Sequence, residues 1–394
     1  MTRLTLLDDH GGTRSVVAEQ PTELTRPTSR FTSRVAYAAA HVVPHAWADN
    51  TPGRPADVDW DATLGFRRHL WSWGLGVADA MDTAQRNMGL DPAATRELIT
   101  RSADEARAES GFGSVADAVV AGVNTDHIDD ELITLDHVVA GYLEQLEFTQ
   151  QTGAGTVLMA SRHLARAARS ADDYVEVYHR VLSQADQPVI LHWLGEAFDP
   201  QLAGYFGSTD VAEASKVVLQ IIGDHVNAVG GIKMSLLDAE AEIALRAELP
   251  DGVRLFTGDD FNYSRLIEGD GERYSDALLG AFAAVGPNAS AAIQALDAGD
   301  HDRYHAILDP TEALSRQVFA APTFYYKTGV AFLSWLNGHQ PAFSMVGGLH
   351  SARSLPHLSE IVRLAAEAHA LTDVDRAAAR WHGLLSLNGI ETVR

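Results

Sequence analysis

Eight short apolar runs, separated by segments of helical period, constrain the fold of this chain more than any other feature. They occupy Val35–Val43, Gly74–Ala80, Ala116–Val123, Gly155–Ala160, Pro188–Trp193, Val226–Met234, Val253–Thr257 and Ala277–Val285. Helix starts stand between them, such as Asp91-Pro92 before Ala93–Glu109 and Thr134 before Leu135–Gln150. This alternation predicts a parallel α/β sheet with crossover helices. Eight repeats across about 250 residues favour a closed (β/α)8 barrel over an open sheet.

Two further parts flank the predicted barrel. Residues 1–33 predict a β-hairpin, with strands at Leu4–Leu7 and Ser15–Ala18, and a connector rich in Thr, Pro and Ser. Beyond residue 286 the strand patterns stop and helical patterns occupy Ala289–Ala298, Asp302–Phe319, Thr323–Asn337, Pro356–Leu371 and Val374–Leu387. We therefore expect three domains: a hairpin with connector (1–33), a catalytic barrel (34–286) and a C-terminal helical subdomain (287–394).

Composition excludes several classes of function. The formal net charge of −23 argues against a nucleic-acid groove or an anionic membrane surface, since both require basic clusters. The chain has no cysteine, which excludes disulfides, thiolate catalysis and Cys-ligated metals. No apolar run approaches the ~18 residues of a membrane span, and Asp8-Asp9 stand where a signal peptide would be apolar. We expect a cytoplasmic protein without nucleic-acid or membrane partners.

Lys233 is the most informative single residue, because it stands inside the apolar run Ala228–Ser235. An ammonium group in such a place needs a partner, or its pKa is lowered. A desolvated lysine amine is the nucleophile of Schiff-base enzymes. The alternatives are a buried ion pair with Asp259 or Asp260 and a phosphate-binding lysine.

Short motifs around Lys233 carry a resemblance to a known superfamily. The segments Gly231-Ile232-Lys233-Met234-Ser235 and Leu255-Phe256-Thr257-Gly258-Asp259-Asp260 resemble the dihydrodipicolinate synthase / N-acetylneuraminate lyase superfamily of class I aldolases. Residues 58–62, 188–192 and 323–338 resemble further segments of it in the same order, and within it the chain is similar to the divergent DUF993 branch. The resemblance implies a barrel with C-terminal helices, a Schiff base on Lys233, no other cofactor and a homo-oligomer.

Two departures from the superfamily concern the substrate and proton transfer. The loop that binds the carboxylate of pyruvate corresponds to residues 80–85, where Asp82 places a negative charge. That charge disfavours pyruvate unless Arg86 or Arg162 compensates. The catalytic tyrosine of strand four is missing from the matching residues 160–163. His163 is our candidate proton shuttle, since the unperturbed pKa of histidine, near 6.5, suits acid–base work.

Polar side chains at the ends of the other apolar runs are candidates for substrate binding, because barrel active sites form at the carboxyl ends of the strands. These are Asp82, Thr83, His41, Arg162, His192, Asp259 and Asp260. A structural role is the alternative for several of them. Asp82 can cap a helix, His192 can be a buried barrel residue, and the two adjacent aspartates can start a helix.

Three hypotheses for function remain open on the sequence. In the first, a lyase or aldolase of carbohydrate metabolism forms a Schiff base between Lys233 and a keto acid or keto sugar, while His163 moves protons. In the second, a divalent metal serves sugar isomerisation or an aldol reaction. Its ligands would be His41, His163, His192, Asp82, Asp259 and Asp260. In the third, a sugar-binding barrel has lost catalysis, and the missing tyrosine is its support.

Overall fold

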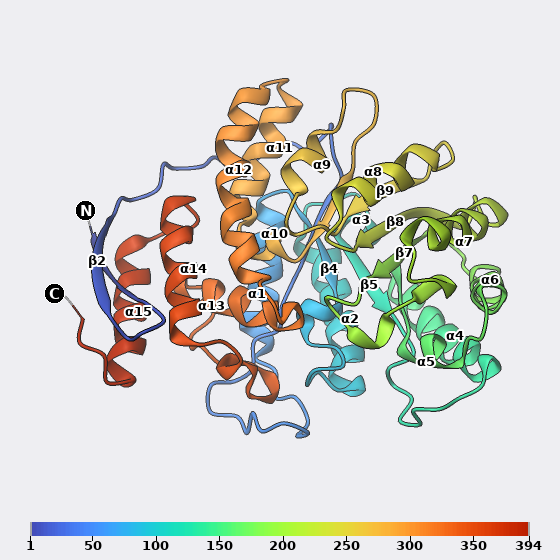
Figure 1. The fold of residues 1–394 in the computed structure, drawn as a ribbon, viewed down its shortest axis with the longest axis horizontal. Coiled ribbons are helices and arrows are strands. Elements are labelled where there is room, and N and C mark those ends of the chain that lie inside the picture. Colours follow the sequence, from blue (N-terminus) through green and yellow to red (C-terminus); the bar gives the residue numbers. More distant parts are fainter. Residues whose placement is uncertain (1, 393–394) are drawn as a thin grey trace.

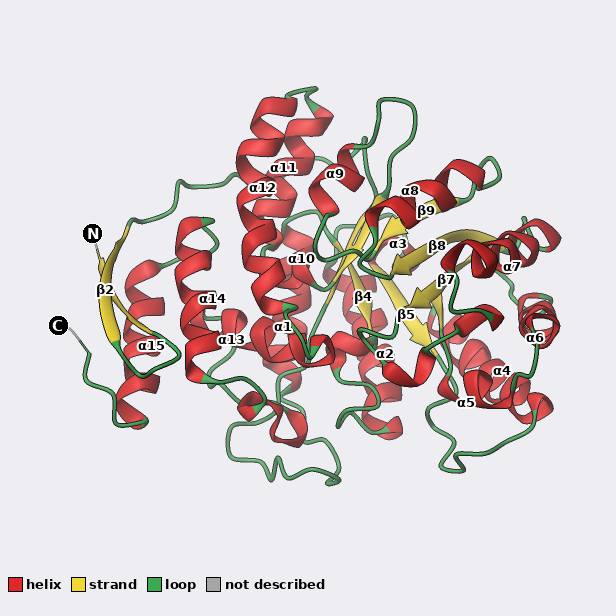
Figure 2. Cartoon of the chain, in the orientation of Figure 1, coloured by secondary structure: helices red, strands yellow, loops and turns green. Residues whose placement is uncertain are grey.

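A closed barrel of eight parallel strands forms the centre of the protein (Figure 1 and Figure 2). The structure, a computed structural model, describes residues 2–392. The barrel strands are β3 (Ala36–Ala39), β4 (Gly76–Asp79), β5 (Val119–Val123), β6 (Gly155–Met159), β7 (Val189–Leu194), β8 (Val229–Ser235), β9 (Arg254–Thr257) and β10 (Asp276–Leu279). Each strand pairs with its neighbour in the chain, and β10 pairs with β3 to close the barrel. The predicted fold class is confirmed.

Helices and short 3-10 turns connect the strands and cover the outside of the barrel (Figure 2). The helices are α1 (Trp60–Ser72), α2 (Pro92–Glu109), α3 (Val115–Ala118), α4 (Leu135–Thr152), α5 (Arg162–Ala167), α6 (Ala171–Leu182), α7 (Val211–Asp224), α8 (Ala239–Glu248), α9 (Tyr263–Glu268) and α10 (Ala281–Ala284). The 3-10 turns are η1 (Asp82–Ala84), η2 (Pro200–Leu202) and η3 (Tyr205–Gly207). The predicted caps form: the Asp91 carboxylate accepts from the Ala94 amide and the Thr134 hydroxyl from the His137 amide.

Two separate apolar clusters explain why the strand runs are apolar throughout. One fills the barrel interior and includes Tyr37, Val120 and Phe256, whereas the other lies between the strands and the surrounding helices. Alternate residues of a strand point to opposite sides, so a strand covered on both faces has no polar side. The last predicted run divides: β10 ends at Leu279, and residues 281–284 form α10. An apolar run alone does not separate a strand from a short buried helix.

The C-terminal helical part lies beside the barrel and carries the N-terminal hairpin (Figure 1). Its helices are α11 (Gly286–Asp297), α12 (His301–Val318), α13 (Tyr326–Leu336), α14 (Leu355–Glu367) and α15 (Val374–Leu387), with 3-10 turns η4 (Thr323–Tyr325) and η5 (Val346–Ser351). The hairpin consists of β1 (Thr2–Leu7) and β2 (Thr13–Ala18).

Hydrogen bonds tie this hairpin to the end of the chain. The Trp381 indole donates to the carbonyl of Thr5 at 2.7 Å, and the Leu7 amide donates to the Ser359 hydroxyl at 2.7 Å. The hairpin therefore packs against α14 and α15, which come from the other end of the sequence. The division into three domains at residues 33 and 286 stays a prediction. Within residues 2–392, no helix combines the length and apolar character needed to cross a membrane.

A fully buried ion pair joins α1 to the carboxyl ends of β3 and β4. The Arg67 guanidinium donates to both carboxylate oxygens of Asp79, at 2.8 and 3.2 Å, and to the carbonyl of His41 at 2.6 Å. Neither side chain of the pair is exposed to solvent. The Asp79 carboxylate also accepts from the amide of Ala80, a residue held at a positive φ of 49°. This pair therefore fixes the start of the loop that follows β4.

Replacement of Arg67 by methionine should lower the free energy of unfolding by about 3–5 kcal/mol, because it leaves the Asp79 carboxylate buried without its partner. The neighbouring Arg68 offers a matched control, since its guanidinium is 43% exposed and pairs with Glu105 at the surface. R68M should cost less than about 1 kcal/mol. Urea denaturation of both variants measures the difference, and equal losses would contradict a special role for the buried pair.

Candidate active site

Lys233 lies near the carboxyl end of β8, between the neighbouring strands β7 and β9. In the strand register it stands beside His192 of β7 and Phe256 of β9. The residue is only 8% exposed. Burial lowers the pKa of its amine, while the charges of Asp260 and Asp82 act in the opposite direction. No residue in the described range 2–392 forms a hydrogen bond or an ion pair with its nitrogen. The ion pair considered from the sequence is thus not formed.

Gly258 creates the space that the Lys233 side chain occupies. A Cβ atom at this position would lie 2.8 Å from Cε of Lys233 and would overlap the Ser235 hydroxyl. The same hydroxyl lies 3.2 Å from Nε2 of His192, whose Nδ1 is buried without a partner among the described residues. Burial and the nearby Lys233 hold the pKa of His192 well below its ordinary value. A neutral imidazole therefore stands next to the amine.

The two aspartates after β9 have different roles in the structure. The carboxylate of Asp259 accepts from the amides of Phe261 and Asn262 and from the Asn262 side chain, at 2.8–3.1 Å, and so organises the start of α9. Asp260 is buried, and within residues 2–392 its carboxyl group accepts only from the Ala281 amide, at 2.8 Å. Burial raises the pKa of Asp260 to about 7 despite the charge of Lys233. Of the two carboxyl groups whose charges raise the pKa of Lys233, Asp260 has the larger effect and Asp82 the smaller.

Asp82 and Thr83 lie in η1, directly after β4. The negative charge of Asp82 acts on Lys233, on the Tyr326 phenol and on Lys327. The hydroxyls of Thr83 and Tyr326 share a buried hydrogen bond of 2.7 Å. The predicted pair Asp82-Thr83 therefore faces two side chains of α13, which lies outside the predicted barrel.

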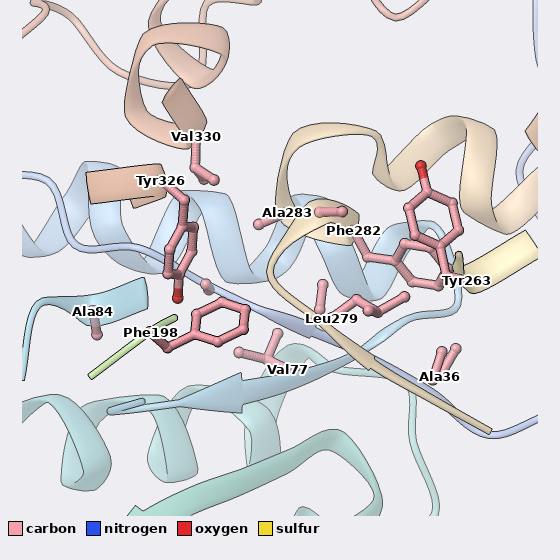
Figure 3. Packing of buried hydrophobic residues seen from close by; sticks show 14 of the residues in the cluster. Ala36, Val77, Ala84, Phe198, Tyr263, Leu279, Phe282, Ala283, Tyr326 and Val330 are labelled. Atoms are coloured by element: carbon pink, nitrogen blue, oxygen red, sulfur yellow. The ribbon is translucent and has the colours of Figure 1, made fainter. Parts of the chain in front are cut away.

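Tyr326 and Lys327 are the residues that our sequence reasoning missed. The Tyr326 ring stacks on Phe319 at 4.3 Å and meets Phe198 edge-on at 5.9 Å. Figure 3 shows the ring reaching from its helix toward Phe198 and Ala84. Burial raises the pKa of this phenol well above its ordinary value. One sequence feature could have revealed them: a Tyr-Lys pair stands inside the apolar segment 323–338. The resemblance matched this segment only to the helix that follows the barrel.

His163 and Arg162 lie at another part of the barrel rim, after β6. The His163 ring nitrogens are both engaged, Nδ1 with the Thr125 hydroxyl at 2.8 Å and Nε2 with the carbonyl of Asp130 at 3.1 Å. His163 lines a small cavity of about 140 Å³ whose lining residues do not include Lys233. Arg162 also borders it and donates to Asp199 at 2.6 Å. The role of His163 in proton transfer stays a prediction.

His41 is buried at the end of β3. Its Nε2 lies 2.9 Å from the side-chain oxygen of Gln340, in the C-terminal part, and its Nδ1 has no partner among the described residues. Burial lowers the pKa of His41 to about 3, so its ring is neutral. In residues 2–392 no three His, Asp or Glu side chains are gathered in a way that could hold a metal ion. The six ligands of the metal hypothesis therefore do not form a preassembled site.

Gly258→Ala should lower the free energy of unfolding by about 1–3 kcal/mol, because the added methyl group displaces Lys233 and Ser235 in a closely packed region. Gly223 in α7 is the matched control, since a Cβ there meets nothing within 4 Å. G223A should instead stabilise the helix by about 0.5–1 kcal/mol. Chemical denaturation of both variants tests this, and a neutral G258A would show that the space around Lys233 is not required.

Asp260 should make stability depend on pH. Its pKa is about 7 in the folded chain and 3.8 as an ordinary aspartate, so the folded protein holds a proton that the unfolded chain releases. This contribution is complete below the lower value and is lost as the pH rises through the higher one. Relative to D260N, the wild type should lose a few kcal/mol between about pH 4 and about pH 8. D302N, at an exposed aspartate of α12, should show no such trend.

The comparisons with known proteins agree with this architecture. Residues 4–390 match the family described as "Protein of unknown function (DUF993)". A search of curated proteins finds no match. Among solved structures, dihydrodipicolinate synthase from Oceanobacillus iheyensis is 13% identical with a TM-score of 0.60, covering 85% of this chain and 95% of that chain. The enzyme from Bacteroides thetaiotaomicron is 12% identical with a TM-score of 0.63, covering 85% and 99%.

A third similar structure was determined with a ligand. YagE from E. coli K12, a prophage protein of the dihydrodipicolinic acid synthase family solved in complex with pyruvate, is 13% identical with a TM-score of 0.62, covering 91% of this chain and 99% of that chain. At these identities the likeness establishes the fold. It agrees with the barrel and C-terminal helices that the resemblance implied. Because the family match spans nearly the whole sequence, the chain belongs to the DUF993 family, a divergent branch with the dihydrodipicolinate synthase fold.

Proposed function

We propose that this protein is a lyase or aldolase that forms a Schiff base between Lys233 and a small keto acid or keto sugar. One observation carries the proposal: a buried amine without a hydrogen-bond partner in the described chain, at the carboxyl end of a barrel strand. Burial lowers its pKa and so favours the neutral, nucleophilic form. The fold shared with dihydrodipicolinate synthases supports the same reaction class.

The neighbours of Lys233 suit the steps of such a reaction. The neutral amine adds to the substrate carbonyl and gives a carbinolamine, which loses water to form an iminium ion. The iminium withdraws electrons from the adjacent carbon–carbon bond, which can then break or form. Asp260, whose pKa lies near 7, can give a proton to the departing hydroxyl and accept it back. The unpaired Nδ1 of neutral His192 can accept a hydrogen bond from the substrate.

Proton transfer to the substrate is assigned here to the Tyr326–Thr83 pair rather than to His163. The two hydroxyls share a hydrogen bond beside Asp82, whose charge also reaches Lys233. Both nitrogens of His163 are instead occupied by other groups. In this proposal the phenol enters the barrel end from α13, and no tyrosine at the end of β6 is needed.

Borohydride trapping tests the proposal directly. Wild-type protein is incubated with 2-oxo acids and keto sugars, reduced, and examined by intact mass and peptide mapping. We expect one reduced adduct, on Lys233, that is absent from K233M and retained in K216M, because Lys216 is an exposed residue of α7 paired with Glu213. No adduct with any compound, or an adduct on another residue, would contradict the Schiff-base mechanism.

The same assay separates the two candidates for proton transfer. Y326F should slow formation of the iminium that borohydride traps by about 10²-fold or more, the usual contribution of a general acid–base group. H163A should leave it within a few-fold of wild type. The reverse ranking would return the proton shuttle to His163.

A further inference from the structure

Lysine is rare in this protein, and two of its three lysines are buried at the same end of the barrel. Of the 30 Lys and Arg residues, only Lys216, Lys233 and Lys327 are lysines, so arginine supplies nearly every surface cation. Lys216 is exposed on α7, whereas Lys233 and Lys327 are 8% and 2% exposed. A lysine placed inside this chain is therefore not an ordinary surface cation, and Lys327 needs an explanation of its own.

Lys327 is held by few polar contacts. It follows Tyr326 in the first turn of α13, and its ammonium donates to the thioether sulfur of Met88 at 3.2 Å. Within the described residues no other acceptor binds it. An ammonium has three donors and a thioether is a weak acceptor, so most of its hydrogen-bonding capacity is unused. Burial lowers its pKa to about 8, against the opposing charges of Asp82 and Asp199. A buried donor of this kind is costly unless a ligand satisfies it.

Arg86 and Arg162, the two arginines that could have compensated the charge of Asp82, form ion pairs with other aspartates. The Arg86 guanidinium donates to Asp126 at 2.8 Å and to the carbonyl of Gly122 at 2.6 Å, and it is fully buried in these contacts. Arg162 donates to Asp199 at 2.6 Å. Among the described residues, the charge of Asp82 instead acts on two lysines, Lys233 and Lys327, and raises the pKa of each.

The charges at this end of the barrel leave the Lys327 ammonium with few carboxylates to balance it. Lys233 and Lys327 share Asp82, and the raised pKa of Asp260 keeps much of that carboxyl neutral near pH 7. Arg162 and Asp199 neutralise one another. Among the described residues, Asp82 is thus the one uncommitted carboxylate that acts on the Lys327 ammonium, in a region of low dielectric where an added anion interacts strongly.

We infer that Lys327 binds an anionic oxygen group of the substrate, either a carboxylate or a phosphate, at the end of the barrel that α13 covers. This inference rests on the proposed function and deepens it, because it makes the substrate an anionic carbonyl compound rather than a neutral sugar. The lysine is a point charge with donors only, which suits one anionic oxygen. The anion site is supplied by the C-terminal helices, not by the loop after β4.

Ligand-induced thermal shifts test the inference without requiring a reaction. Inorganic phosphate, pyruvate and the neutral ketone hydroxyacetone are each titrated against wild type, K233M, K327M and K216M. K233M cannot form the Schiff base, so a shift in this variant reports noncovalent binding. We expect phosphate or pyruvate, but not hydroxyacetone, to stabilise K233M. K216M should bind both anions as the wild type does, and K327M should bind them at least tenfold more weakly. The stronger of the two anions identifies the group.

A second variant, D82N, should change the affinity for the anion in the opposite direction. It therefore keeps the inference testable if K327M does not fold. D82N removes the like charge beside the anion and should tighten anion binding severalfold. Wild-type anion affinity in K327M, no anion binding to the wild type, or weaker binding in D82N would each overturn the inference. Anion binding that depends on Lys327 without any adduct on Lys233 would refute only the Schiff-base proposal. An adduct on Lys233 with anion affinity independent of Lys327 would refute only this inference.

Discussion

Burial of two lysine amines within reach of the charge of Asp82 is the constraint on which the carboxyl end of this barrel depends. Lys233 and Lys327 are both withdrawn from water, and the charge of Asp82 opposes the desolvation of each. Asp82 can do so only if the loop after β4 keeps one conformation. The buried pair of Arg67 with Asp79 holds the start of that loop, and Arg86 holds the carbonyl of Ala80 at 3.2 Å. Structural arginines thus position the groups proposed for chemistry.

The C-terminal helices complete the barrel rather than merely follow it. Helix α13 packs against η1 and brings the Tyr326 phenol to Thr83, so the site combines strand ends with residues from the last fifth of the chain. The N-terminal hairpin packs on α14 and α15 in turn, and these helices pack with α13. The Tyr326 phenol and a second lysine, Lys327, are thereby supplied to the barrel end from outside the barrel.

The barrel was predictable because its evidence is local. Each strand is a short apolar run bounded by a helix start, and eight such runs admit few closed arrangements. The same locality explains two runs that span more than one element. The run from Ala277 to Val285 is apolar across β10 and α10, and the run from Ala116 to Val123 is apolar across α3 and β5. Lys233 was found for a related reason: an ammonium inside an apolar run is conspicuous without any knowledge of its neighbours.

Roles that depend on partners distant in sequence were decided only by the tertiary structure. Thr83 and Tyr326 are 243 residues apart, and no local sequence pattern around either residue predicts their hydrogen bond. His163 and Asp259 were reasonable candidates by position, yet both are engaged by neighbours that folding brings to them. Periodicity and burial are encoded within a few turns of chain, so the sequence alone determined the barrel and its buried lysine. Which polar groups meet at the barrel end depends on how α13 packs across it, and that is a property of the whole fold.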